Sequence, residues 1–440
     1  MAETSRRAPG ILLAVLMAAM AAGPVFNYGV GALSATIVDS YGVTEGQYGY
    51  IITAVFLLAG ITAPVLGVLA DRIDTRVQLA LIFGGVLAAF LLSATWQSYA
   101  VLLVSALIAG VSQSFSNPVT NRIVARNVPL SQRATWMGWK QSGVQVGLLV
   151  SGLTFPVIGA VAGWRGAALF GAALCVPALF AGWFVVTRLQ RRAITYPATT
   201  PTPPLASRPA LPGPTTPDVT GPDTRSAAEA RAGAGAGAAA SSSSGKLPAA
   251  VWLFTVTSFL NAVGTQGVNV YASLFAVRAM GYTVTVAGVL LGVMGVIGIG
   301  SRIGWGRVSG RLGRPAPLIQ LMSLGGIAGL VLLVLAETTQ QHWLMWLGVA
   351  FHAALPLAAN VVINSGIVAA VPRERIGVAS GLVATGMYLG FALGPVVVGQ
   401  LVDLTGAFTA GWAAVAGAYV LCFVAAVVLG RVQAAGPRTG

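Results

Sequence analysis

The sequence predicts an all-α membrane protein whose twelve transmembrane helices form two pseudo-symmetric six-helix bundles. Three observations lead to this prediction. Of the 440 residues, 56% are hydrophobic and 8% are charged, whereas soluble domains carry about 25% charged residues. The apolar residues gather in twelve runs, each near the roughly 20 residues that a membrane-spanning helix needs. Motifs of the first half return at a constant spacing in the second half.

The apolar runs place the twelve spans in order along the chain. They are predicted at residues 11–37, 46–70, 77–95, 99–121, 134–161, 164–187, 249–277, 284–305, 316–336, 343–368, 376–402 and 409–430. Prolines inside them, such as Pro118 and Pro356, do not break the count, because neighbouring helices can satisfy the backbone groups that a proline frees. The first run follows two arginines but has no clear cleavage site, so we expect an uncleaved helix.

Residues 188–248 interrupt the apolar pattern and divide the chain. Proline, alanine, glycine, serine and threonine dominate this stretch, and so few large apolar side chains cannot offset the entropy of ordering it. We therefore predict an N-terminal bundle at 1–187, a disordered cytoplasmic linker at 188–248 and a C-terminal bundle at 249–440. Cys175 and Cys422, each inside an apolar run, are expected to be buried and unpaired.

The two halves repeat each other. Asn117 and Asn121 recur 243 residues later as Asn360 and Asn364, and the Val128-Pro129 pair recurs at the same spacing as Val371-Pro372. Parallel repeats related by an axis along the membrane normal are a standard construction of transporters, with the substrate site between them. The repeat therefore predicts a central site at mid-membrane depth.

The placement of arginines predicts the orientation. If the N-terminus is cytoplasmic, only Arg165 and Arg278 fall outside, while the other arginines near the spans fall inside. This bias predicts a multi-pass protein of the cytoplasmic (inner) membrane with both termini in the cytoplasm. The formal net charge of +14 does not indicate nucleic-acid binding, because the basic residues are dispersed between apolar runs rather than clustered on a soluble module.

The loop after the second span carries a motif with a partial echo in the second half. Gly67, Asp71, Arg72 and Arg76 form the first copy, and Gly306, Arg311 and Arg314 belong to the second. With six plus six spans and a central loop, these residues resemble the major facilitator superfamily. Two residues depart from the family pattern. Asp74 occupies a position where the family usually has glycine, and Gly310 stands in the second copy where the family has an acidic residue. Asn117 through Gly143 resembles, less closely, the bacterial cyanate and nitroimidazole transporter branch.

The resemblance implies a conformational latch between the cytoplasmic ends of the two halves. Its residues would be Gly67, Asp71, Arg72, Arg76, Arg311 and Arg314. In the family the third, sixth, ninth and twelfth spans are peripheral supports, and those spans here are almost bare of polar side chains. The other spans would line the cavity.

Polar side chains inside the predicted spans mark a candidate substrate site. Amides repeat at steps of four on spans four, seven and ten, which places each set on one helical face. The predicted substrate-binding residues are Lys140, Arg302, Asn27, Tyr28, Gln113, Asn117, Gln141, Asn261, Asn269, His352 and Asn360. The alternative for each amide is that it joins neighbouring helices by hydrogen bonds.

The prediction that the substrate is an anion depends mainly on two cationic residues, Lys140 and Arg302. Lys140 lies about six residues into span five, roughly 9 Å from the cytoplasmic end of that helix, where it could meet an anionic substrate or snorkel to the membrane surface. Arg302 could line the same cavity or anchor the end of span eight. Members of the resembled family that carry carboxylates have an arginine in span eight, and Arg302 is similar in placement, so both interpretations are kept.

The absence of certain residue types from the predicted spans also narrows the range of possible functions. No aspartate or glutamate falls in mid-span, so His352 is the only titratable group of the kind that proton-driven pumps need. The alternative for His352 is a hydrogen-bonded core residue. No nucleophile triad, metal-ligand spacing or nucleotide motif is found, so we expect no enzyme activity, no cofactor and no metal.

The predicted function is secondary active transport of a small organic or inorganic anion by rocker-switch alternating access. One alternative is an efflux pump for drugs or amphipathic metabolites, with Trp139, Tyr28, Tyr271 and Tyr388 as aromatic contacts. Another is a transporter-like sensor that signals through the 188–248 linker. The expected partners are the small solute and the lipid bilayer, with no nucleic acid. A coupling ion is left open, and we expect a monomer.

Overall fold

A computed structural model describes residues 10–195, 247–372 and 375–435, and the regular elements in those ranges are all helical. Their bounds are α1 Gly10–Ala32, α2 Ser34–Tyr41, α3 Glu45–Arg72, α4 Thr75–Thr95, α5 Tyr99–Asn127, α6 Leu130–Thr195, α8 Ala249–Arg278, α9 Val284–Leu312, α10 Pro315–Thr339, α11 His342–Ala354, the 3₁₀ helix η2 Pro356–Ala358, α12 Ala359–Ala370, α13 Ile376–Thr405 and α14 Phe408–Ala435. The helices up to Leu189 and from Pro248 onward form one compact unit. The predicted linker falls mainly on residues outside the described ranges.

The helices account for twelve membrane spans, as predicted. Ten stretches of the described residues are long and apolar enough to cross a membrane. One of them, in α6, contains two spans, because Gly163 interrupts the helix with φ 60° and ψ −165°, a backbone conformation that glycine adopts at little cost. The twelfth span is α8, whose hydropathy is lowered by buried polar side chains such as Asn261, Gln266 and Asn269.

Two predicted spans are broken, which corrects the single helices expected at 11–37 and 343–368. The first ends at Ala32, and α2 begins at Ser34 after Leu33 leaves helical geometry. The other ends at Ala354 because Pro356 has no amide hydrogen to continue the backbone ladder. Ala358 N instead donates to Leu355 O at 3.1 Å in the short 3₁₀ turn. A periodic apolar run does not reveal either break.

Several pairs of helices join the first half to the second, among them α3 with α13 and α6 with α9. Along α3 and α13, Thr53 Oγ1 donates to Ala392 O at 2.7 Å. Along α6 and α9 the backbones approach closely, and a Cβ atom on Gly152 would lie 2.6 Å from Gly292 N and 2.7 Å from Gly288 O. Such a contact is too short for any larger residue, so this seam requires glycine.

Each half has its own aromatic core. In the first half the ring centroids of Phe26 and Phe90 lie 5.1 Å apart, and those of Phe90 and Phe155 lie 6.0 Å apart. In the second half Phe275 meets Trp412 edge to face at 5.5 Å. These tilted arrangements are the favourable ones for aromatic pairs, and they fix the helices that hold the polar residues between them.

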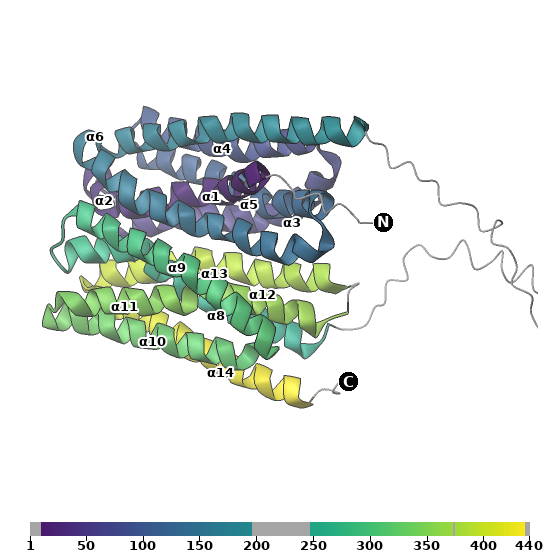
Figure 1. Cartoon of the computed structure of the whole chain (residues 1–440). Helices are drawn as coiled ribbons and strands as arrows, with labels where there is room; N and C mark the ends of the chain where they lie inside the picture. Colours follow the sequence, from purple (N-terminus) through teal and green to yellow (C-terminus); the bar gives the residue numbers. More distant parts are fainter. Residues whose placement is uncertain (1–9, 196–246, 373–374, 436–440) are drawn as a thin grey trace, which may run out of the picture. The chain divides into compact units, whose positions relative to one another are not determined.

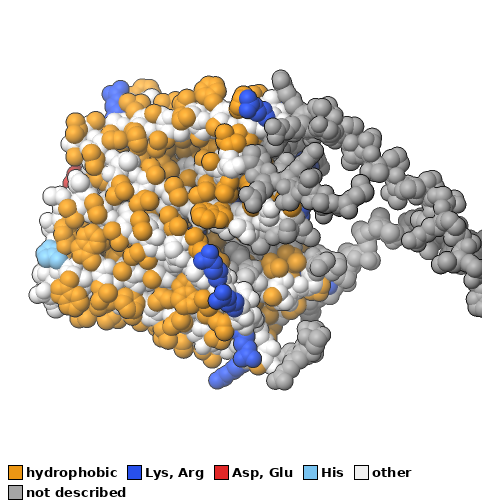
Figure 2. All heavy atoms as spheres, viewed as in Figure 1, with side chains coloured by type: hydrophobic (Ala, Val, Ile, Leu, Met, Phe, Trp, Pro, Cys, Tyr) orange, Lys and Arg blue, Asp and Glu red, His pale blue; other side chains and the backbone are white. Residues whose placement is uncertain are grey.

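Large apolar side chains cover the outside of the helices (Figure 2). Val65, Phe180 and Leu404 are each more than 60% exposed, an arrangement that suits lipid rather than water. Basic side chains in Figure 2 gather toward the end where α6 finishes and α8 begins, at the right of Figure 1. We call this end the linker end and the opposite one the far end.

Hydrogen bonds close the two halves against each other at the far end. Asp403 Oδ2, at the end of α13, accepts from Thr44 Oγ1 at 2.6 Å and from Gly46 N at 3.0 Å. The carboxylate of one half therefore caps the first turn of α3 in the other half. Tyr271 OH donates to Glu45 O at 2.6 Å, and Arg278 forms an ion pair with Asp39. All of these contacts join α2 and α3, with the loop between them, to α8 and α13.

Candidate functional site

Lys140 is buried inside the first half rather than extended to the membrane surface. It lies ten residues after α6 begins at Leu130, about 15 Å along the helix. The predicted 9 Å was too short because α6 starts four residues earlier than expected. The side chain is 1% exposed, and Nζ donates to Thr120 Oγ1 at 2.8 Å and to Asn117 Oδ1 at 3.5 Å. The snorkelling alternative is therefore wrong.

Arg302 reaches from α9 in the second half to α6 in the first. Its Nη1 donates to the backbone oxygen of Gln141 at 3.4 Å. The amide of Gln145, oriented with Oε1 toward the guanidinium, accepts from Arg302 Nε at 3.2 Å and from Nη2 at 2.9 Å. The guanidinium thus faces the other half, and it does not simply anchor the end of its own helix.

Gln141 connects the surroundings of the two cations. Its Nε2 donates at 3.4 Å to Asn117 Oδ1, the same oxygen that Lys140 approaches, while its backbone oxygen accepts from Arg302. The turn of α6 that carries Lys140 is therefore also the one that Arg302 contacts. We call Asn117, Thr120, Lys140, Gln141, Gln145 and Arg302 the cationic cluster.

The partners of both cations in the described structure are neutral. Hydroxyl, amide and carbonyl oxygens surround them, and Met20 Sδ lies 4.0 Å from Lys140 Nζ. The acidic side chains that are described, Asp39, Glu45, Asp74, Glu337 and Asp403, lie at or near helix ends. A buried charge without a counterion is costly. The cluster therefore presents two positive charges surrounded by neutral oxygen atoms.

Further polar groups extend the cationic cluster toward α1 and α13. Asn27 Nδ2 donates to Gln113 Oε1 at 2.8 Å, and Gln113 lies one turn of α5 from Asn117. The Asn27 Oδ1 atom is buried and has no hydrogen-bond partner among the residues that the structure describes. Tyr28 lies near Arg302, and Tyr388 lies near Asn117. Both halves therefore contribute polar groups around α5 and α6.

The predicted residues of α8 and α11 form a separate group within the second half. His352 Nε2 lies 3.2 Å from Asn269 Oδ1, and the histidine is 2% exposed. Asn261 Nδ2 donates to Thr265 Oγ1 one turn along α8 at 3.3 Å. Asn360 is half-buried near the start of α12. No hydrogen bond between described side chains connects this group with the cationic cluster.

The predicted latch is only partly described. Gly67 and the side chains of Asp71 and Arg72, on the last turns of α3, lie outside what the structure describes. Asp74 Oδ1 accepts from Arg76 N at 2.8 Å and caps the first turn of α4, which gives this departure from the family motif a structural role. The second copy, Arg311 and Arg314, is exposed at the linker end of α9.

Sequence reasoning did not select Thr120, Gln145 or Asp403. Thr120 follows Asn117 by three residues and Gln145 follows Gln141 by four, so helical spacing placed each beside a selected residue. Asp403 gave no such signal, because its partners Thr44 and Gly46 are more than 350 residues away in sequence.

Comparison with known proteins finds several transporters. An MFS-type transporter of Aspergillus fumigatus is 34% identical over 110 residues, 25% of this chain and 25% of the relative. The class B tetracycline resistance protein of Escherichia coli is 29% identical over 117 residues, 27% and 28% of the two chains. An uncharacterised MFS-type transporter of Methanocaldococcus jannaschii is 23% identical over 139 residues, 32% and 36%. The matches thus span only about a quarter to a third of these relatives.

Solved structures resemble this one over almost the whole chain. The inward-facing, unoccupied crystal structure of a bacterial homologue of the human lysosomal transporter Spinster superposes with a TM-score of 0.63 at 15% identity. It covers 98% of this chain and 97% of its own. The nucleoside transporter NupG superposes with a TM-score of 0.66 at 13% identity and covers 96% and 99%. At such identities the likeness shows a shared fold.

Twelve spans in two halves are an arrangement that this chain shares with the solved transporter structures. The model of the Major Facilitator Superfamily matches residues 11–367. The chain belongs to the major facilitator superfamily, and the resemblance noted from its sequence motifs is confirmed.

Proposed function

We propose that this protein is a secondary active transporter of a small organic or inorganic anion. The observation that supports this most is that Lys140 lies on the turn of α6 that Arg302 contacts, and that among the described residues both cations have only neutral partners. An anion between them would supply the missing counter-charge, and its attraction to both cations is strong in a low-dielectric interior. The amides of Asn117, Gln141 and Gln145 would orient it by hydrogen bonds.

The proposed mechanism is alternating access by rocking of the two halves. The far-end bonds of Asp403 and Tyr271 hold one side closed, and the latch residues after α3 would hold the linker end when the far end opens. We place the linker end in the cytoplasm of a cell whose inner membrane the protein spans as a monomer. Arg302 joins the halves at the cationic cluster, so a bound anion would affect the contact between them.

The thermal unfolding of the purified protein, measured against a panel of anions and drugs, tests this proposal. A ligand that binds only the native state stabilises it by about 2.7 kcal/mol when present at 100 times its dissociation constant. We expect small anions to raise the midpoint of unfolding, and a Lys140→Gln variant to lose most of that rise. Stabilisation by uncharged drugs alone would contradict the anion assignment.

The second candidate is efflux of drugs or amphipathic metabolites. It is favoured by the partial match to the tetracycline resistance protein and by two aromatic side chains, since Trp139 is 48% exposed and Tyr388 lies near Asn117. Tyr271, by contrast, is engaged in the far-end contact with Glu45. The same panel separates the two candidates, because efflux predicts stabilisation by amphipathic compounds that does not depend on Lys140.

Substitution of Asp71 tests the latch. Asp71→Asn removes the negative charge that would hold the cytoplasmic ends of the halves together when the far end is open, so transport should slow about ten-fold, the loss expected for one charge-assisted contact. The amount of folded protein should change little. Uptake into proteoliposomes and the elution profile of the purified variant measure the two quantities. Unchanged uptake would remove Asp71 from the latch.

A further inference from the structure

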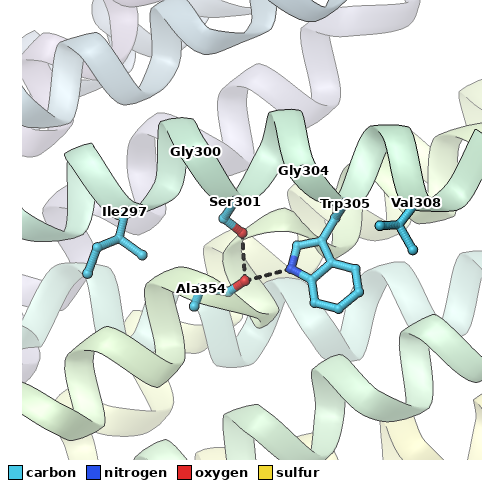
Figure 3. Close-up of a pocket in the computed structure, with 7 residues that line it drawn as sticks. All are labelled: Ile297, Gly300, Ser301, Gly304, Trp305, Val308 and Ala354. Carbon is cyan, nitrogen blue, oxygen red and sulfur yellow. Dashed lines mark hydrogen bonds between the residues drawn. The ribbon is translucent and has the colours of Figure 1, made fainter.

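A groove of about 470 Å³ runs along the outer face of α9, away from the cationic cluster. Figure 3 shows its lining, which comes from Ile297, Gly300, Ser301, Gly304, Trp305 and Val308 of α9 and from Ala354 at the end of α11. Gly300 and Gly304 form its open side, since a Cβ atom on either would meet no other atom within 4 Å. The lining from Ile297 to Val308 extends about 16 Å along the helix axis, close to half the thickness of a bilayer's hydrocarbon core.

The polar groups in the groove are already bonded to each other. Ser301 Oγ and Trp305 Nε1 donate to the same oxygen, Ala354 O, at 2.6 Å and 2.8 Å (Figure 3). The break of the helix before Pro356 leaves this oxygen without its usual partner in the backbone ladder, because Ala358 N donates to Leu355 O instead. With its donors and acceptor satisfied, the groove presents an apolar surface that suits a hydrocarbon chain.

Basic side chains stand at the linker end of the groove. Arg307 and Arg311 follow Gly300 and Gly304 by seven residues each, which places the four on one face of α9. Each arginine lies about 10 Å beyond its glycine along the helix axis. Both are exposed, and neither is paired with a carboxylate in the part of the chain that the structure describes. Figure 2 shows a row of basic side chains crossing this apolar face near the linker end.

We propose that this groove binds one acidic phospholipid, with an acyl chain over Gly300 and Gly304 and its phosphate at Arg307 and Arg311. Charge complementarity selects the acidic lipid, because two neighbouring guanidinium groups without counterions attract an anionic headgroup more strongly than a zwitterionic one. Trp305 would pack its indole edge against the acyl chain. The site is independent of the transported solute, since Arg302 points from the opposite side of α9 toward α6.

Quenching of Trp305 fluorescence by brominated lipids tests the site in the full chain. The protein is reconstituted in phosphatidylcholine vesicles that contain increasing fractions of brominated phosphatidylglycerol or brominated phosphatidylcholine. The sequence has ten tryptophans, so the Trp305 contribution is the difference between the wild type and Trp305→Phe. We expect half-maximal quenching at a roughly 25-fold lower fraction of the acidic lipid, about five-fold for each arginine.

Three variants define the result. The double variant Arg307→Gln and Arg311→Gln should lose the preference for phosphatidylglycerol but remain quenched by either lipid. Gly304→Leu fills the open groove and should reduce the quenching of Trp305 by both lipids. Arg431→Gln, which removes an exposed arginine at the linker end of α14, is the matched control and should retain the preference. Equal quenching of the wild type by both lipids, a preference that survives the double variant, or an unquenched Trp305 would each overturn the proposal.

Discussion

Replacing Lys140 by methionine is expected to abolish anion uptake and at the same time to raise the thermal stability of the protein. Uptake should fall by at least about 100-fold, because removing one of two cations that pair with a buried anion costs several kcal/mol of binding free energy. Stability should rise by about 1–4 kcal/mol, by analogy with buried ion pairs whose replacement by apolar residues of similar volume gives such a gain. Methionine fits this position because its chain resembles that of lysine and Met20 is already adjacent.

The opposite signs make this prediction specific. A lysine that serves only to hold α1, α5 and α6 together through Thr120 and Asn117 would destabilise the protein when removed. Uptake into proteoliposomes and the midpoint of thermal unfolding without added anion measure the two effects. Arg126→Gln, which removes an exposed cation near the end of α5, is the control and should change neither. Normal uptake by Lys140→Met would exclude Lys140 from the anion site.

Asp403→Ala is expected to open the far end. The variant removes two hydrogen bonds across the halves, from Thr44 Oγ1 and from Gly46 N. Hydrogen bonds to a charged group contribute about 1.5–3 kcal/mol, so the equilibrium between closed and open far ends should shift by about ten-fold or more. The shift should be seen in the resting protein, without substrate.

A single cysteine placed between α8 and α1, where the two halves meet, can report this opening. Ser273 is 1% exposed, and its hydroxyl donates across the halves to Ala32 O, so Ser273→Cys in a chain lacking Cys175 and Cys422 is protected while the far end is closed. A membrane-impermeant thiol reagent should label it about ten times faster with Asp403→Ala. Glu337→Ala is the matched control, because Glu337 also accepts from a helix start, at Phe408 N and Thr409 Oγ1, but within one half. Equal labelling rates in both variants would show that Asp403 does not hold the far end.

The positions of the spans could be predicted because membrane burial depends on a local property, the apolarity of about 20 consecutive residues. The starts predicted for α8, α9 and α13 coincide with those observed at Ala249, Val284 and Ile376. The breaks at Leu33 and Leu355 could not be predicted in the same way. At Leu355 the break is tolerated because Ser301 and Trp305, on another helix, satisfy the freed oxygen of Ala354. No window of sequence around Pro356 contains that information.

For the candidate site, the sequence by itself determined which polar residues lie inside the membrane and that no carboxylate lies in mid-span with them. Only the tertiary structure decided that Lys140 points inward to Thr120, that Arg302 reaches Gln145 on the other half, and that His352 belongs to a separate group. The physical reason is that hydropathy is a local property, so a short stretch of sequence is enough to show which residues enter the membrane. The partners of a buried charge are chosen by how distant helices pack, and close packing depends on side chains that are far apart in sequence.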